Sequence, residues 1–101
     1  MSILARYSQD TKSYIIEING KFNFSILTEF RKAYKDEGLS SVEIILDLKG
    51  TDAIDSSALG MLLNLQRYFD KPDGEIKIIN CNEVIEKVFR ITSFDKKFTI
   101  K

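Results

Sequence analysis

The chain has 101 residues, of which 44% are hydrophobic and 30% are charged, as is typical of a single folded domain. Lysine plus arginine and aspartate plus glutamate number 15 each, so no net charge attracts nucleic acid or an anionic membrane. The sequence has no histidine and one cysteine, which excludes a Ser-His-Asp or Cys-His catalytic arrangement and an ordinary zinc site. We therefore expect one domain over residues 1–101, with no metal and no cofactor.

The N-terminal third predicts a hairpin followed by a helix. Ile3–Tyr7 and Tyr14–Ile18 have the pattern of two short strands with a polar turn between them. A helix capped by Ser25 is expected to run to about Asp36, because its apolar residues recur on one face.

The middle of the chain predicts a central strand and a strongly apolar helix. Val42–Leu48 is almost continuously apolar, the pattern of a strand covered on both faces of a sheet. A short polar turn follows, and then a helix from Ser56 to about Phe69. The apolar arc of this helix is wider than the ~100° that a surface helix needs. Either the helix is wedged between the sheet and a neighbouring helix, or one flank stays exposed and docks a partner.

The last third predicts a turn, a strand, a helix and a final strand. The turn is Lys71–Gly74, which contains proline and glycine, and the strand is Glu75–Asn80. A helix capped by Asn82 is expected to end at about Ile91, before a short strand at Phe98–Ile100. Strands that alternate with helices predict an α/β fold with a small, mixed, mostly parallel sheet, an N-terminal β-hairpin and about three helices.

The sequence also indicates the compartment. No apolar run approaches the length of a membrane span, and the N-terminus lacks the features of a signal peptide. Cys81 is the only cysteine, which fits a reducing compartment, and we interpret it as a partly buried bystander thiol. A cytoplasmic protein is therefore expected.

Asp55-Ser56-Ser57, at the start of the apolar helix, is the most informative motif. It places two hydroxyls at a helix N-terminus, where unpaired backbone N–H groups and the helix dipole favour an anion. Serine is also common at helix starts as a cap. A reversible phosphorylation switch is the leading hypothesis. The alternative, an enzyme with Asp47, Asp52 and Asp55 as acid–base carboxylates, competes with ordinary capping and turn roles for the last two, so we expect no enzyme.

The run Asp55–Gly60, which reads Asp-Ser-Ser-Ala-Leu-Gly, resembles the signature of STAS domains. The chain looks most like bacterial anti-sigma factor antagonists of the sporulation and general-stress type. Gly20–Asn23 is similar to the family's first conserved segment, although Asn23 stands where the family often has aspartate and Ala58 where it usually has glycine. Family members commonly carry a further C-terminal helix, so one side of the sheet is expected to be less covered or open to a partner. Carried over by position, the family's phosphorylated serine is Ser56.

The resemblance implies control by partner switching. The unphosphorylated protein would bind a serine kinase that is also an anti-sigma factor or a similar regulator. The kinase would use ATP and Mg²⁺ to modify Ser56, the complex would dissociate, and a PP2C-type phosphatase would reset it. No nucleic acid and no membrane insertion are expected. The alternative is an accessory STAS subunit of a lipid-transporting ABC system, in which the same helix contacts the ATPase.

The expected partner-binding surface surrounds the phosphorylation site. It comprises Asn23, Asp55, Ser57, Ala58, Leu59, Gly60 and Leu63.

Overall fold

The computed structural model describes residues 2–35 and 41–101, and its elements follow the predicted order with two further short strands. The strands are β1 (Ile3–Ser8), β2 (Ser13–Ile18), β3 (Gly20–Phe22), β4 (Glu43–Asp47), β5 (Thr51–Ile54), β6 (Lys77–Ile79) and β7 (Thr99–Ile100). The helices are α1 (Leu27–Tyr34), α2 (Ser56–Phe69) and α3 (Glu83–Ile91), with single 3₁₀ turns η1 (Phe24–Ile26) and η3 (Phe94–Lys96).

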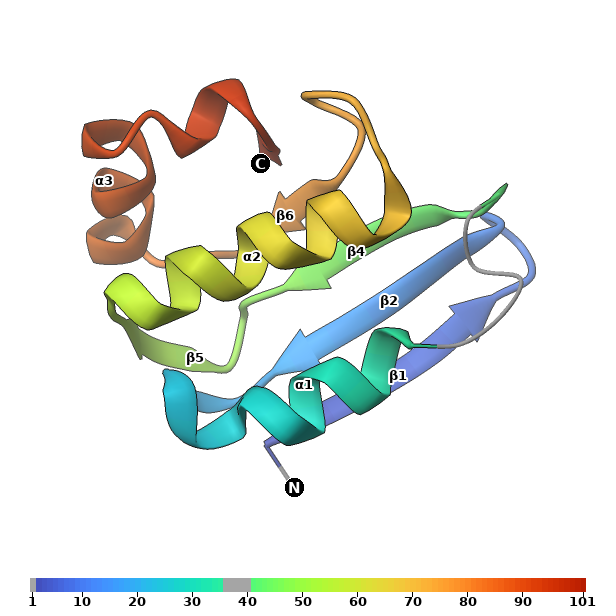
Figure 1. Cartoon of the computed structure of the whole chain (residues 1–101), viewed down its shortest axis with the longest axis horizontal. Helices are drawn as coiled ribbons and strands as arrows, with labels where there is room; N and C mark the ends of the chain where they lie inside the picture. Colours follow the sequence, from blue (N-terminus) through green and yellow to red (C-terminus); the bar gives the residue numbers. More distant parts are fainter. Residues whose placement is uncertain (1, 36–40) are drawn as a thin grey trace.

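The main sheet is mixed, as predicted. Its strand order is β1-β2-β4-β6-β7, with an antiparallel β1–β2 hairpin and parallel pairing elsewhere. The strand predicted at residues 42–48 is therefore central. Each parallel crossover steps to the next strand in the same direction, and because such crossovers are right-handed, the helices lie on one face of the sheet (Figure 1).

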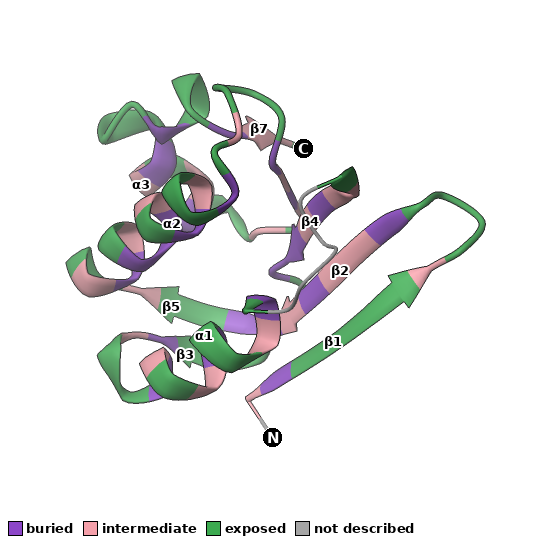
Figure 2. Ribbon diagram, turned by 45° about the vertical axis from the view of Figure 1, so that its right-hand side comes forward, coloured by how far each residue is buried: buried purple, intermediate pink, exposed green. Residues whose placement is uncertain are grey.

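The expectation that the central strand is covered on both faces is wrong. Ile44 and Leu46 are fully buried beneath the helices, whereas Ile45, on the opposite face, is only half-buried. Ile45 lies beside Ile15 of β2 in the sheet register, and such cross-strand apolar pairs shield each other from water. This pairing explains an apolar run on a face without helices. Figure 2 shows that most of the edge strand β1 is exposed.

A second, two-stranded sheet was not predicted. Residues 51–54, expected as a polar turn, form β5 and pair in parallel with β3. Both strands are too short to show an alternating pattern, and Asp52 and Ala53 are exposed. Thr51 ties this sheet to the main one, because its hydroxyl donates to the Ile18 carbonyl at 2.6 Å.

The predicted start of the first helix is also wrong. Asn23, not Ser25, caps the 3₁₀ turn η1 that precedes the helix, because its Oδ1 accepts hydrogen bonds from the Ser25 backbone nitrogen at 2.9 Å and hydroxyl at 2.6 Å. The helix α1 itself begins at Leu27, after Ile26, without a side-chain cap. Both residue types cap helices well, so local sequence does not decide between them. The predicted helix end at Asp36 lies outside the described residues.

The core lies between α2 and the sheet. Its residues show which side of this wide apolar helix is buried and which side reaches the surface. Five α2 residues are buried, namely Ala58, Met61, Leu62, Leu65 and Phe69. Leu59 and Leu63, on one flank, remain half-buried. The helix is therefore wedged into the core and still offers an apolar flank to solvent.

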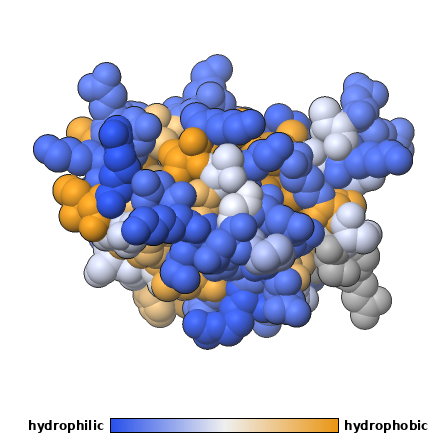
Figure 3. All heavy atoms as spheres, turned by 90° about the horizontal axis from the view of Figure 1, so that it is seen from above, coloured by the Kyte–Doolittle hydropathy of each residue, from blue (hydrophilic) through white to orange (hydrophobic). Residues whose placement is uncertain are grey.

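Figure 3 shows one face of the molecular surface, coloured by hydropathy. Seen from above, most of one face is hydrophilic, and apolar side chains form separate patches (Figure 3). Among the described helices, none is both long and apolar enough to cross a bilayer.

Candidate functional site

The small β3–β5 sheet brings two helix starts together. Phe22 of β3 pairs with Ile54 of β5, so the next residues, Asn23 and Asp55, follow neighbouring parallel strands. Asn23 caps η1, which leads into α1, and Asp55 caps α2. The carboxyl end of this sheet therefore positions both caps.

The start of the third helix is tied to the same sheet. Asn82 caps α3 through its Oδ1, which accepts from the Ile85 backbone nitrogen at 2.8 Å. Its Nδ2 donates to the carbonyl oxygens of Thr51 and Asp52, both at 3.5 Å. The N-termini of α1, α2 and α3 thus lie at the same end of the molecule (Figure 1).

The two serines after Asp55 have different environments. The Ser57 hydroxyl donates to Asp55 Oδ1 at 2.6 Å, and the same oxygen accepts from the Ala58 backbone nitrogen at 3.1 Å. Both hydrogen bonds lower the pKa of Asp55 below its usual value, and the bond from the Ser57 hydroxyl has the larger effect. Ser56 is exposed, and within the described part of the chain its hydroxyl has no hydrogen-bond partner. Ser57 is therefore part of the cap, while Ser56 is exposed to solvent.

The other predicted surface residues are placed unequally. Gly60 is exposed, Leu59 and Leu63 are half-buried, and Asn23, also half-buried, uses its side-chain oxygen in its cap. Ala58 is fully buried. Its methyl group belongs to the core, so the expected partner contact through this side chain is not available in this conformation.

Gly60 occupies open space in the middle of α2. A Cβ built there meets no other atom within 4 Å. We expect Gly60→Ala to raise the free energy of unfolding by about 0.5–1 kcal/mol, because alanine loses less backbone entropy than glycine in a helix. Urea denaturation would measure this, and a destabilised Gly60→Ala protein would show that the site is not open.

The carboxylates of the enzyme hypothesis have separate structural roles. Asp47 is 9% exposed, and its Oδ1 accepts from the Lys49 backbone nitrogen at 3.0 Å and from Asn80 Nδ2 at 3.1 Å. Asp55 is a cap, and Asp52 is exposed on β5. Across residues 2–35 and 41–101, no group of three metal-ligating side chains comes together. The geometry thus offers no support for shared acid–base chemistry.

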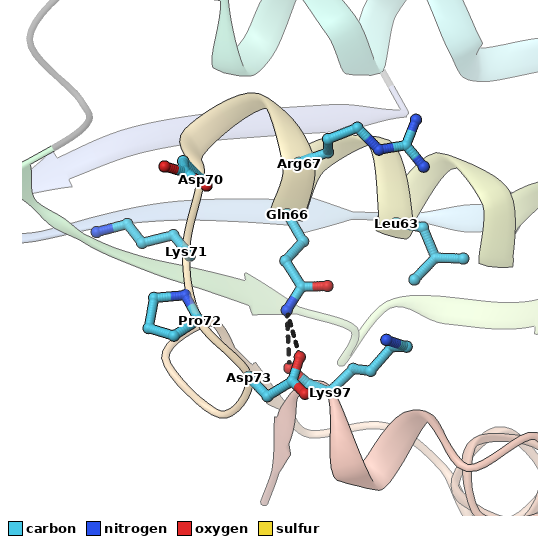
Figure 4. A pocket seen from close by; sticks show the side chains of 8 residues that line it. All are labelled: Leu63, Gln66, Arg67, Asp70, Lys71, Pro72, Asp73 and Lys97. Carbon is cyan, nitrogen blue, oxygen red and sulfur yellow. Dashed lines mark hydrogen bonds between the residues drawn. The ribbon is translucent and has the colours of Figure 1, made fainter.

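A cavity of about 550 Å³ lies at the other end of α2. It is lined by Leu63, Gln66, Arg67, Asp70, Lys71, Pro72, Asp73 and Lys97 (Figure 4). Gln66 crosses it, with Nε2 donating to Asp73 Oδ1 at 3.1 Å and to the Lys97 carbonyl at 3.3 Å. These bonds join α2 to the turn at residues 71–74 and to the backbone of Lys97, and both cations and carboxylates line the cavity. The Gln66 side chain therefore anchors that turn to α2.

Fold and site together define a small α/β domain whose helices cover one face of a sheet and whose central helix starts with an exposed serine. The sequence model of the STAS domain matches residues 3–101, and the chain belongs to this family.

Relatives of known name share the fold over almost the whole chain. A STAS-domain-containing protein of Pseudomonas aeruginosa strain UCBPP-PA14 is 34% identical over 100 residues, which cover 99% of each chain. The crystal structure of a candidate anti-sigma factor antagonist of Thermotoga maritima has a TM-score of 0.79 and 25% identity, covering 97% of this chain and 84% of that one. The phosphorylated form of the Bacillus cell fate determinant SpoIIAA has a TM-score of 0.63 and 18% identity, and the match covers 98% of this chain and 90% of that one. The predicted family and fold class are confirmed.

Proposed function

We propose that this chain is a phosphorylation-controlled binding protein of the anti-sigma factor antagonist type. In its unphosphorylated form it binds a serine kinase that is also an anti-sigma factor or a similar regulator, and phosphorylation of Ser56 releases it. The observation that carries the proposal is the exposed Ser56 hydroxyl at the N-terminus of α2, which has no hydrogen-bond partner among the described residues and lies beside a Ser57 hydroxyl that is used in the cap. The name of the Thermotoga maritima relative, a candidate anti-sigma factor antagonist, supports the same class of function.

A phosphate on Ser56 changes the surface without requiring a change of fold. It adds about −1.5 to −2 charges at neutral pH. The dipole at the start of α2 stabilises this charge locally. Asp52 and Asp55 are already exposed nearby, so the phosphate makes this end of the molecule strongly negative. A partner with an acidic or apolar surface there is repelled.

The partner-binding surface extends from Ser56 along one side of α2. At about 100° per residue, Ser56, Gly60, Leu63 and Arg67 share this side. We call it the Ser56 face. Gly60 lets a partner backbone approach the helix closely, and Leu63 adds a half-buried apolar contact.

The covalent chemistry in this scheme belongs to the partners. The kinase supplies ATP and Mg²⁺, and a PP2C-type phosphatase removes the phosphate. This chain supplies only the acceptor hydroxyl and the docking surface, so we propose that it acts as a regulator in the cytoplasm rather than as an enzyme.

Mass spectrometry tests the phosphorylation site. The serine kinase that co-purifies with the Ser56→Ala protein would be isolated and incubated with ATP and each variant. We expect a phosphate on Ser56 of the wild type and of Ser57→Ala, and none on Ser56→Ala. Circular dichroism would establish that both variants are folded. Modification at Ser57 alone would contradict the assignment.

A further inference from the structure

A second feature of the α2 surface is a groove between α1 and α2, at the end away from Ser56. It has a volume of about 350 Å³ and is lined by Arg31, Tyr34, Lys35, Asn64, Arg67 and Tyr68. The two helices run in the same direction, so their C-terminal ends meet at the same end of the molecule (Figure 1). We call this feature the α1–α2 groove.

The α1–α2 groove concentrates positive charge in a chain with no net charge. Arg31, Lys35 and Arg67 line it together, and none of the described residues that line the groove is a carboxylate. All three are exposed, and none forms an ion pair within the described residues. Cations in the last turn stabilise each helix dipole, which accounts for their positions along α1 and α2. The dipoles do not account for the convergence of the three cations on one groove.

An aromatic platform lies beside these cations. Tyr68 is 50% exposed, and its ring centroid lies 5.3 Å from that of Tyr34 and 5.0 Å from that of Phe69. Tyr34 and Phe69 are buried, so they hold the Tyr68 ring in place. Asn64 Oδ1 also accepts from Arg67 Nη1 at 3.4 Å. Fixed tyrosine and arginine side chains are typical of the energetic centres of protein interfaces.

We propose that the α1–α2 groove binds an acidic segment of the same partner that docks on the Ser56 face. Tyr68 serves as the apolar anchor, and the three cations pair with carboxylates of that segment. The inference rests on the proposed function, because it names the chemistry of that partner.

One partner can contact both the Ser56 face and the α1–α2 groove. Ser56 and Arg67 are eleven residues apart on α2, which corresponds to about 16 Å along the helix. A standard interface of about 800 Å² per partner spans this distance. The separation also exceeds the Debye length of about 8 Å at physiological salt, so a charge on Ser56 has little effect on the groove.

Selection from a peptide library tests the proposal. Random peptides of about twelve residues would be selected on the immobilised chain, and their binding measured by fluorescence anisotropy and by NMR titration of the labelled protein. We expect selected peptides to be rich in aspartate and glutamate, to shift the amides of residues 31–35 and 64–68, and to bind more weakly at high salt. Arg31→Glu with Arg67→Glu should weaken binding at least about 10-fold, because two attractive contacts become repulsive.

A matched control separates the groove from net charge. Lys87→Glu with Lys96→Glu makes the same charge change at two exposed positions on α3 and η3, and should alter affinity by less than about threefold. Ser56→Asp should leave peptide affinity within about twofold of the wild type. Failure of the Ser56 switch and failure of groove binding are therefore distinguishable. If the double glutamate variant does not fold, Arg31→Gln with Arg67→Gln tests the same contacts.

Three results would overturn the proposal. The first is selected peptides without acidic residues, or with NMR shifts elsewhere. The second is an equal loss of affinity in the Lys87 and Lys96 control. The third is a groove that responds to inorganic phosphate or anionic vesicles and to no acidic peptide.

Discussion

Ser56→Asp is expected to weaken binding of the partner at least about 30-fold, while the free chain keeps its fold. The carboxylate places a permanent negative charge at the exposed start of α2, close to Asp52 and Asp55. Opposing or unpaired charges in an interface typically cost about 2–5 kcal/mol, which is enough to dissociate a micromolar complex. Isothermal titration calorimetry with the partner captured by Ser56→Ala would measure the change.

Thermal unfolding shows whether Ser56→Asp weakens binding through the interface or through loss of the fold. An acidic side chain in the first turn of a helix interacts favourably with the helix dipole, so Ser56→Asp should unfold at the same temperature as the wild type or slightly above it. Ser56→Ala should bind the partner at least as well as the wild type. Partner affinity that is equal in Ser56→Asp and Ser56→Ala would contradict the proposed switch.

Leu62→Ala is expected to lower the free energy of unfolding by about 2–5 kcal/mol, a large share of the stability of a small domain. Leu62 is fully buried between α2 and the sheet, and alanine leaves a cavity there. Leu63 is the matched control, because it is the next residue on the same helix and is half-buried. Leu63→Ala should cost less than about 1 kcal/mol, since it removes less buried surface. Urea denaturation would measure both values.

The same pair separates stability from binding. Leu63→Ala is expected to weaken partner binding, because Leu63 lies on the Ser56 face, whereas folded Leu62→Ala protein should bind normally. A larger loss of stability in Leu63→Ala than in Leu62→Ala would mean that the sides of α2 are assigned the wrong way round.

Elements with strong local signals were predicted correctly. The apolar period of α2 and the capping residues Asp55 and Asn82 mark helix starts through interactions within a few residues. The hairpin and the central strand likewise follow from apolar pattern and turn residues. The family signature then directed attention to Ser56.

Elements that depend on distant partners were missed. β3 and β5 are short strands held together mainly by their pairing across about thirty residues of sequence, a contact that local pattern does not show. The open face of β4 was mistaken for a covered one, because Ile45 packs beside Ile15 rather than beneath a helix. Asn23 and Ser25 are equally good caps in sequence, and only the folded backbone selects Asn23.

By itself, the sequence determined the order of the helices and of the strands of the main sheet, the apolar character of α2 and the position of two hydroxyls at its start, because these depend on period and capping within single segments. Only the tertiary structure decided that Ser56 is exposed while Ser57 is used in the cap, that Ala58 belongs to the core, and that Arg31, Lys35 and Arg67 converge beside Tyr68. The exposure of a side chain and the meeting of two helices are set by packing between segments far apart in the chain, and no local pattern records that packing.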